Sequence, residues 1–227
     1  MKTIAVIAAA GSGSRFGSSL NKAFHLLCGK PVLLHVLEMF QQAPEIDEII
    51  PVFKDDDFIR GRKLISENGI TKVLSIAKGG KERQDSILNA LNVIGDTDAI
   101  VLIHDGARPL ITHRLIKETI SELVDCDGVI PAVKMIDTIK EVDDGLIVKT
   151  IDRNRLRAIQ TPQTFYSKIL ISAYKHVIDK GLLFTDDASV IEHYGGRVKY
   201  IDGDYKNIKI TSKDDLLYAE FIIRQIK

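Results

Sequence analysis

The stretch "TIAVIAAAGSGSRFGSSLNKAF" (residues 3–24) decides the fold, because an apolar run leads directly into a turn rich in glycine and serine. Residues 3–8 have the length and the continuous apolar character of a buried strand. Glycines let a backbone come close to a ligand, and backbone amides that follow a strand often hold a phosphate. This order predicts an α/β protein with an anion-binding loop at the end of its first strand.

The glycine spacing of this turn fits neither of two well-known phosphate-binding loops. A dinucleotide fingerprint reads G-x-G-x-x-G, and Gly11 and Gly13 satisfy only its first half. The third glycine, Gly17, comes one residue late, and Phe16 stands where the following helix must pack closely. A P-loop needs a lysine directly after its last glycine, and here a serine follows. If a phosphate binds here, it must be held in another way.

Two cations, Arg15 and Lys22, lie in the same stretch. A guanidinium and an ammonium can bracket one polyphosphate while the backbone amides of Gly11 and Gly13 approach it. The alternative is a surface turn whose charges are only solvated. The turn taken alone leaves both interpretations open.

The rest of the chain alternates strand-like and helix-like segments. Apolar runs of strand length lie at residues 3–8, 48–53, 72–77, 99–104, 128–133 and 197–202. Helical spacing of apolar residues is found at 31–42, 57–68, 83–94, 113–124, 167–180 and 186–194. A final helix is expected after residues 212–215, "SKDD", which resemble a capping box. This alternation predicts a Rossmann-like α/β fold, with a mostly parallel central sheet and helices on both faces.

One segment, residues 134–165, breaks this rhythm. It alternates apolar and polar residues around Asp143-Asp144-Gly145, a turn signal of β-hairpins. So long an excursion from a compact sheet predicts a protruding β-arm, and such arms often pair with another subunit. We therefore expect a single domain over residues 1–227, with 134–165 as an arm for dimerisation.

The composition limits the possible functions. The chain has 31 basic and 31 acidic residues, so no overall field attracts nucleic acid or an anionic membrane, and neither partner is expected. Cys28 and Cys126 lack metal-ligand spacing and are typical of reduced thiols. Neither a signal peptide nor an apolar run of membrane-helix length is recognised. These features predict a cytoplasmic protein.

Two further motifs place polar residues where an open α/β sheet binds ligands. "KGGKER" (78–83) opens a predicted helix, where backbone amides favour an anion. "HDGARP" (104–109) lies at the carboxyl end of the apolar strand 99–104. There Asp105 can bind a metal or a ribose hydroxyl, and Arg108 can bind a phosphate. For each motif the alternative is an ordinary turn, with solvated charges and with Asp105 as a turn cap.

The remaining polar residues show neither a Ser-His-Asp pattern nor a pair of catalytic carboxylates. The histidines form no cluster, which argues against a histidine-bound metal, and His104 is interpreted as a core residue. Lys209 stands between Ile208 and Ile210 in "NIKIT" (207–211), so in a strand it would face the side opposite to them.

Taken together, these segments resemble the 2-C-methyl-D-erythritol 4-phosphate cytidylyltransferases of the non-mevalonate isoprenoid pathway. The resemblance rests on "AAAGSGSRFG…NK", "GGKERQDSI", "HDGARP", "DTIK", "DRNRLRAIQTPQTF", "TDDAS" and "NIKIT", which follow one another in the family's order nearly from end to end. It implies transfer of CMP from CTP to a sugar-alcohol phosphate with release of pyrophosphate. It also implies a nucleotidyltransferase fold, Mg²⁺ as cofactor and a homodimer that exchanges its arms.

The resemblance also assigns roles to individual residues. The implied nucleotide-binding residues are Ala9, Ala10, Gly11, Gly13, Gly80, Lys81, Arg83, Ser86 and Gly106. The residues implied in catalysis are Arg15, Lys22, Arg153 and Lys209. Those implied for the sugar-alcohol phosphate are Asp105, Arg108, Thr138 and Thr185. Asp105 is in addition a candidate Mg²⁺ ligand, with the CTP phosphates holding most of that ion. Thr138 and Arg153 belong to the arm and would serve the partner subunit's site.

The chain departs from the family pattern at two places. The family usually has Pro-Lys-Gln after the loop, whereas Asn21-Lys22-Ala23 stands here, which leaves the approach of the lysine open. Gly106 replaces an alanine or a serine, a small change for a backbone contact.

Two other functions remain as alternatives. A ribitol 5-phosphate cytidylyltransferase would share CTP, the fold and most motifs, but Ala107 and Asp152-Arg153 favour the isoprenoid enzyme. A nucleotide-binding module without catalysis is disfavoured by the presence of Arg15, Lys22 and Asp105 together.

Overall fold

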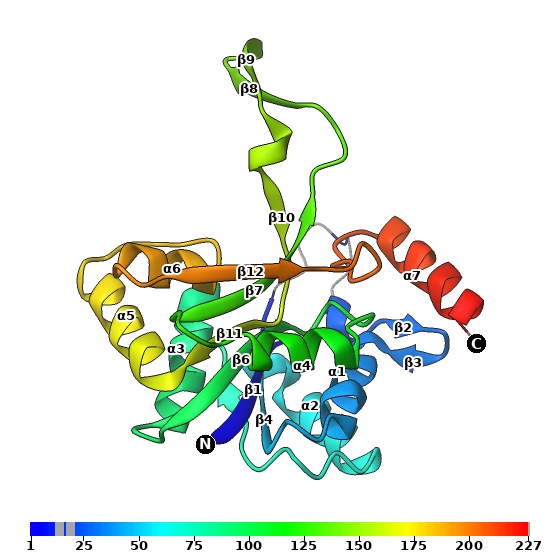
Figure 1. The fold of residues 1–227 in the computed structure, drawn as a ribbon. Helices are drawn as coiled ribbons and strands as arrows, with labels where there is room; N and C mark the ends of the chain where they lie inside the picture. Colours follow the sequence, from blue (N-terminus) through cyan, green and yellow to red (C-terminus); the bar gives the residue numbers. More distant parts are fainter. Residues whose placement is uncertain (12–15, 17–20, 227) are drawn as a thin grey trace.

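The central sheet is built around the predicted first strand. In the computed structural model, which describes residues 1–11, 16 and 21–226, eight strands form this sheet. They are β1 (Lys2–Ala8), β4 (Glu48–Phe53), β5 (Ala77–Lys78), β6 (Ala99–Asp105), β7 (Gly128–Lys134), β10 (Arg157–Ile159), β11 (Gln163–Tyr166) and β12 (Val198–Asp202). Their order is β10-β7-β11-β6-β1-β4-β5, and β12 pairs with β7 (Figure 1). The predicted first strand thus lies near the middle of the sheet.

Strand β1 is apolar from Ile4 to Ala8 because both of its faces are buried there. It lies between β4 and β6 and runs parallel to both. Ile4 and Val6 enter the core on one side of the sheet, and Ala5 and Ile7 enter the core on the other. A strand covered on both faces needs no polar alternation. The sheet is mostly parallel, and β10 and β11 are its antiparallel members.

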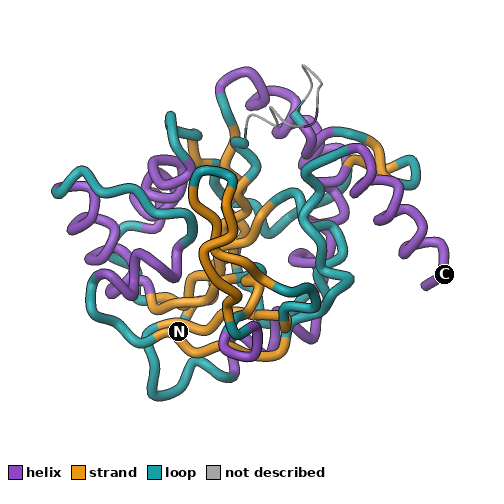
Figure 2. The backbone as a smooth tube through the Cα atoms, turned by 90° about the horizontal axis from the view of Figure 1, so that it is seen from above, coloured by secondary structure: helices purple, strands orange, loops and turns teal. Residues whose placement is uncertain are grey.

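Helices cover both faces of the sheet, as the sequence predicted. One core includes side chains of α3 (Arg83–Ile94), α5 (Ser167–Asp179) and α6 (Asp187–His193). The other includes side chains of α1 (Val32–Gln42), α2 (Asp55–Glu67) and α4 (His113–Ser121). Seen from above, the strands run between these two groups of helices (Figure 2). No helix in the described ranges is long and apolar enough to cross a membrane.

A smaller unit lies beside the main sheet. Strands β2 (Leu26–Leu27) and β3 (Lys30–Pro31) pair with each other near the helix α7 (Lys213–Ile226) (Figure 1). Leu27 of β2 shares an apolar cluster with Ala219 of α7. The predicted capping box at the start of α7 is confirmed. The amide of Asp215 donates to Oγ of Ser212, and the amide of Ser212 donates to Oδ2 of Asp215.

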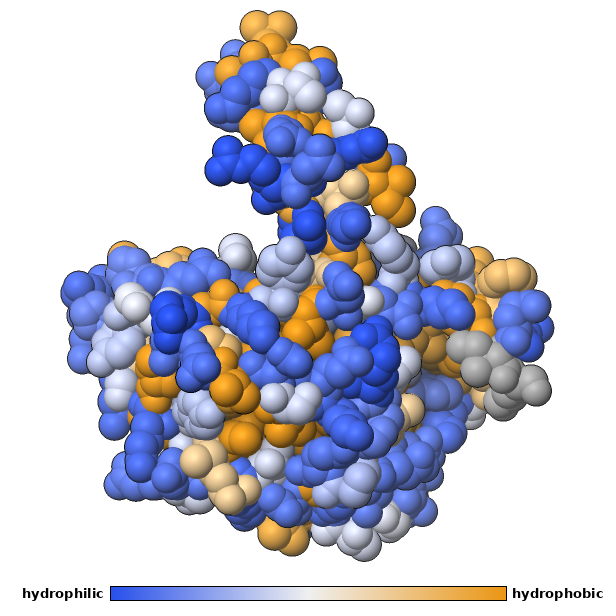
Figure 3. All heavy atoms as spheres, in the orientation of Figure 1, coloured by the Kyte–Doolittle hydropathy of each residue, from blue (hydrophilic) through white to orange (hydrophobic). Residues whose placement is uncertain are grey.

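The arm is a hairpin that projects away from the body of the molecule. It consists of β8 (Ile139–Asp143) and β9 (Leu146–Ile151), and Figure 1 shows it extended with nothing packed against it. Asp144 and Gly145 both have positive φ angles, which suits the tight turns of hairpins. Leu146 and Ile147 are 74% and 66% exposed, and apolar atoms are visible at the tip in Figure 3.

The prediction of a strand over residues 72–77 is wrong. Only Ala77–Lys78 form β5, and Val73 makes one isolated bridge to Ile49. This segment runs along the outer side of β4, where a strand has a partner on one side only, and Leu74 is 72% exposed. A short apolar run at an edge is a weaker signal because little burial enforces the strand there.

Two other boundaries differ from expectation. The range 134–165 is longer than the arm, because β10 and β11 return to the main sheet and pair with β7 and β6. Residues 207–211 form no strand, and the amide of Ile210 donates to the carbonyl of Ala107 instead. This segment therefore makes one hydrogen bond to a distant part of the chain in place of the strand pairing that its apolar pattern suggested. Helix α2 begins two residues and ends one residue before the predicted bounds, and α4 ends three residues before its predicted end.

Candidate active site

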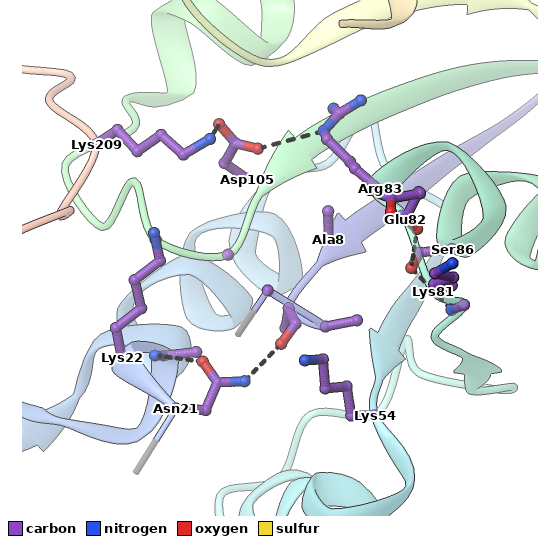
Figure 4. A pocket seen from close by; sticks show the side chains of 17 residues that line it. Ala8, Asn21, Lys22, Lys54, Lys81, Glu82, Arg83, Ser86, Asp105 and Lys209 are labelled. Atoms are coloured by element: carbon purple, nitrogen blue, oxygen red, sulfur yellow. Dashed lines mark hydrogen bonds and ion pairs between the residues drawn. The ribbon is translucent and has the colours of Figure 1, made fainter. Parts of the chain in front are cut away.

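A pocket of about 250 Å³ opens at the carboxyl ends of β1 and β6, and we call it the first pocket. Its lining includes eleven residues that the sequence had singled out: Ala9, Ala10, Gly11, Lys22, Gly80, Lys81, Arg83, Ser86, Asp105, Gly106 and Lys209. Figure 4 shows the long basic side chains converging on it from several sides. Ligands of open α/β sheets bind at this edge. Segments far apart in the sequence thus meet where a ligand is expected.

The floor of the first pocket is backbone held in place by the neighbouring strands. The amide of Gly106 donates to the carbonyl of Ala8 at 2.9 Å, and the amide of Gly79 donates to that of Phe53 at 2.7 Å. A Cβ at Gly79 would lie 2.6 Å from the Cβ of Ala10, and a Cβ at Gly80 would lie 2.2 Å from that of Asp85. A side chain at Gly79 would force the turn away from the loop, and one at Gly80 would force it away from the start of α3. Glycine there keeps the backbone against the pocket.

The start of α3 closes one wall of the first pocket. Glu82 and Asp85 form a capping box, each side chain accepting from the other residue's backbone amide. The hydroxyl of Ser86 accepts from the amide of Gly80 at 2.9 Å and donates to the carbonyl of Glu82 at 3.0 Å. A hydroxyl has two lone pairs, so Ser86 can still accept one bond from a ligand. An amino group of a base is a donor of that kind.

Asp105 lies at the centre of a group of cations. Its carboxylate lies 2.9 Å from Nζ of Lys209, 3.3 Å from Nε of Arg108 and 4.0 Å from Nε of Arg83. Burial alone would raise the pKa of Asp105, but the charges of Lys209, Arg83 and Arg108 outweigh it and hold that pKa far below its ordinary range. Asp105 is therefore an anion at any pH at which the protein works. It aligns the three cations and leaves a net positive charge for an anionic ligand.

Arg83 is held by a buried carboxylate that the sequence had not indicated. Its Nη1 and Nη2 lie 2.9 and 2.6 Å from the two oxygens of Asp187, in the first turn of α6. The phenol of Tyr174 donates to the same carboxylate, and burial together with that charge raises the pKa of Tyr174. Two parallel hydrogen bonds fix the plane of a guanidinium. Asp187 lies within the quoted "TDDAS", but only the fold brings it to Arg83.

A second pocket of about 470 Å³ adjoins the first. Arg83, Asp105 and Lys209 line both pockets and form the wall between them. Arg108 and Thr185, expected at the sugar-alcohol phosphate, line this second pocket. Two ligands bound side by side would therefore meet at one charged wall. That arrangement suits a transfer between two anions.

His104, directly before Asp105, is fully buried and lies behind the wall. Its Nδ1 contacts the hydroxyl of Thr161 at 2.9 Å, and its Nε2 contacts the carbonyl of Arg108 at 3.2 Å. Burial lowers the pKa of His104 to about 4, partly opposed by the charge of Asp105. The imidazole is therefore neutral and supports the loop. Its interpretation as a core residue agrees with this position.

Lys54 is a further cation of the first pocket that sequence reasoning missed. It follows β4 and caps the start of α2, and its side chain extends along the pocket in Figure 4. The surrounding "FKDDD" is typical of an ordinary helix start, so no local pattern marked it. Asn21, where the family usually has proline, also lines this pocket.

A known protein family matches almost the whole chain. Residues 3–225 match the family model IspD, 2-C-methyl-D-erythritol 4-phosphate cytidylyltransferase. The chain belongs to this family. It is accordingly an enzyme of the nucleotidyltransferase class, and the predicted family and fold are confirmed.

Individual relatives match over nearly their full length. A protein of Geotalea uraniireducens named 2-C-methyl-D-erythritol 4-phosphate cytidylyltransferase is 41% identical, over 100% of this chain and 98% of the relative. A Syntrophus aciditrophicus protein of the same name is 42% identical, over 99% of this chain and 97% of the relative. The crystal structure of 4-diphosphocytidyl-2C-methyl-D-erythritol synthase from Anaerococcus prevotii has a TM-score of 0.86 and 31% identity, and the match covers 98% and 96% of the two chains.

Four residues that were predicted for the site of this cytidylyltransferase are not among the described residues that line the first and second pockets. Gly13 and Arg15 lie outside the described residues. Thr138 and Arg153 line neither the first nor the second pocket. Arg153 lines a hollow at the base of the arm with Tyr205, and its guanidinium donates to the carbonyl of Ile136. Within one chain, the arm residues are therefore apart from the other site residues.

The described residues do not form a ready-made metal site. Across residues 1–11, 16 and 21–226, no group of three or more His, Cys, Asp or Glu side chains is suitably placed. Asp105, the candidate ligand, already neutralises cations on several sides. Its surroundings do not fit a protein-held Mg²⁺.

Proposed function

We propose that this chain transfers CMP from CTP to 2-C-methyl-D-erythritol 4-phosphate, releasing pyrophosphate and giving 4-diphosphocytidyl-2-C-methyl-D-erythritol. The observation that carries the proposal is the pair of adjoining pockets with one charged wall, in a chain that matches the family from residue 3 to 225. Two pockets that meet at a wall suit a reaction in which two bound anions exchange a group.

The first pocket is assigned to CTP. The backbone of Ala9, Ala10 and Gly11 would contact the nucleotide, together with Gly13 of the same loop. The cytosine would lie against Gly80, Lys81, Ser86 and Gly106, with Arg83 nearby. The free lone pair of Ser86 is an acceptor for the amino group of cytosine. Lys54 adds a positive charge to the same pocket.

The second pocket is assigned to the sugar-alcohol phosphate. Lys209 and Arg108 converge there on Asp105, so a phosphate that approaches them meets two cations already aligned. Asp105 and Thr185 would bind the hydroxyl groups of the substrate. The wall then holds the substrate phosphate next to the α-phosphate of CTP.

The reaction needs positioning and charge stabilisation more than proton transfer. The attacking oxygen belongs to a phosphate monoester, which is anionic near neutral pH, so the missing general base is no obstacle. Its oxygen bonds to the α-phosphorus of CTP, and the bond from that phosphorus to the pyrophosphate breaks. Arg15 and Lys22 would stabilise the negative charge that builds up on the α-phosphate.

We place Mg²⁺ with the substrate. The triphosphate of CTP offers several oxygens, whereas the described carboxylates offer no comparable site. The ion would neutralise part of the triphosphate charge as CTP binds, and the pocket's own cations would act on the rest.

We further propose a homodimer formed through the arm. Apolar side chains at the tip of the hairpin face solvent in the single chain, and a second subunit would cover them. Thr138 and Arg153 lie away from their own chain's pockets, and arm exchange would bring them to the partner's site. The two cysteines are free, in keeping with a cytoplasmic enzyme.

Pyrophosphate release tests the function directly. The purified protein is given CTP and Mg²⁺ with either 2-C-methyl-D-erythritol 4-phosphate or ribitol 5-phosphate, and kcat/KM is compared. We expect a clear preference for the methylerythritol substrate. A preference for ribitol 5-phosphate would reassign the substrate, and no release with either one would contradict transfer altogether.

A further inference from the structure

Asn21 stands in the wall of the first pocket, but its amide group is occupied by the protein itself. The residue is 8% exposed. Its Nδ2 donates to the carbonyl of Ala9 at 2.8 Å and to Oδ2 of Asp57 at 2.7 Å. Its Oδ1 accepts from the amide of Ala23 at 3.1 Å and caps the short helix η2 (Lys22–Phe24). Both donor hydrogens of the amide are used, so Asn21 is built into the structure.

These bonds join the two ends of the glycine-rich stretch. Ala9 precedes it, directly after β1, and Lys22 follows it, directly after Asn21. Ala9 is fixed in turn, because its amide donates to the carbonyl of Val52 in β4 at 3.1 Å. One side chain therefore sets the backbone of Lys22 relative to the floor of the pocket. Figure 4 shows Asn21 and Lys22 together on the same side of that pocket.

Asp57 connects this junction to helix α2. Asp55, Asp56 and Asp57 form the first turn of α2, and only Asp57 is buried, at 6% exposure. A buried carboxylate needs a close donor, and the amide of Asn21 is much nearer than the guanidinium of Arg60 at 3.8 Å. The amide of Asp57 also donates to the carbonyl of Lys54, which lines the pocket. The pair thus spans the loop and the helix beside it.

We propose that Asn21 and Asp57 are a positioning pair that holds Lys22 at the α-phosphate of CTP. The inference rests on the proposed function, because it concerns the role that Lys22 has there. A lysine side chain is long and flexible, so the placement of its charge depends on a fixed backbone. A displacement of about 1 Å at a reacting centre can cost about 100-fold in rate. Neither member of the pair touches the reacting atoms.

The first test asks whether Asn21 acts through Lys22. Turnover is measured for N21A, K22A and the double variant, with thermal unfolding followed in parallel. We expect N21A to lower kcat about 30-fold or more, with a smaller change in the KM for CTP. In the K22A background, N21A should lower kcat by less than about threefold, because the group that it positions is gone. Equal losses in both backgrounds would show a general structural role and overturn the proposal.

A second set of variants keeps the size of the side chain. N21D still accepts from Ala23 but cannot donate, and it places a carboxylate against that of Asp57. We expect N21D to lower kcat at least as far as N21A does. Adding D57N to N21D should raise kcat again by about fivefold, because it removes the repulsion between the two carboxylates. If N21D retains wild-type turnover, or if D57N restores nothing, the pair has no positioning role.

Asn68 provides a matched control at the other end of α2. Its Nδ2 donates to the carbonyl of Leu64 at 2.8 Å on the exposed side of the helix, so N68D loses a comparable bond far from the pocket. Its turnover should match that of the wild type. Failure of the proposed function would be seen separately: the wild type would then show no CMP transfer, or K22A would be fully active.

Discussion

At the residue scale, the proposed chemistry would depend on cations gathered around the phosphates of the substrates. Lys22 and Arg15 come from a glycine-rich stretch that matches no familiar loop, and that mismatch separated this chain from dehydrogenases and P-loop proteins. Asp105 shows how such cations are kept together, since one carboxylate lies within 4.0 Å of three basic side chains.

Replacing either Lys22 or Arg15 by alanine should lower kcat about 100-fold or more, because a preorganised charge at a transition state contributes about 3–4 kcal/mol. The fold should be unaffected, with an unchanged thermal midpoint. Lys63→Ala, which removes an exposed lysine of α2, is the matched control and should retain full turnover. Near-wild-type turnover in both K22A and R15A would contradict the assignment of the site.

His104 should make the stability of the protein depend on pH. Its pKa is about 4 in the folded chain, whereas an unfolded histidine titrates near about 6.5. Between these values the unfolded state binds the proton and the folded state does not, so the free energy of unfolding falls as the pH drops from about 6.5 to 4. Urea unfolding at several pH values should show a shallower fall in His104→Gln. An identical slope in that variant would exclude His104 as the source.

At the scale of elements, the sequence predicted best those segments that are buried on both faces. Strands β1, β4 and β6 were placed to within one residue, because each is enclosed by neighbours and has a continuous apolar run. Helix α3 was predicted with both ends correct, and the capping box of α7 was recognised. In all of these elements, the local sequence pattern agrees with the burial that the fold imposes.

The failures depend on where a segment lies in the folded chain, which no local pattern shows. Residues 72–77 and 207–211 have strand-like patterns, but one lies along an outer edge and the other crosses to Ala107 by a single hydrogen bond. The candidate site also contains residues whose position depends on the fold and not on a local motif. Only the packing of α6 brings Asp187 to Arg83, and only the end of β4 brings Lys54 to the first pocket, so no local motif could have revealed them.

The contact between α5 and α6 gives a prediction at this scale. The phenol of Tyr174 in α5 donates to Asp187 in α6, and its raised pKa keeps it protonated at all ordinary pH values. Tyr174→Phe removes that bond and should lower the free energy of unfolding by about 1 kcal/mol, measured by urea denaturation. The two bonds from Arg83 to Asp187 remain, so kcat should change little. A large loss of kcat with unchanged stability would show that Tyr174 acts on the reaction itself.

At the scale of the whole molecule, the arm decides whether each active site is built from one chain or from two. Arg153 lies at the base of the hairpin, apart from both pockets of its own chain. If the proposed arm exchange occurs, a mixed dimer of Arg153→Ala and Arg15→Ala subunits collects both lesions in one site and leaves the other intact.

Mixing the two inactive variants should therefore restore about a quarter of wild-type activity, since half of the random dimers are mixed and each has one good site. The subunits must be unfolded and refolded together, or co-expressed, so that they exchange. Each variant treated alone is the control. No recovery in mixtures that demonstrably contain mixed dimers would place Arg153 in the site of its own chain.

If each substrate binds in its proposed pocket, the wall between the pockets would couple the two. Arg83, Asp105 and Lys209 line both pockets, so an anion in one pocket would alter the electrostatic potential met by an anion in the other. Thermodynamic reciprocity then requires that CTP change the affinity for the sugar phosphate by the same factor as the sugar phosphate changes the affinity for CTP. Altering any one of these three side chains should therefore change the dissociation constants of both substrates together.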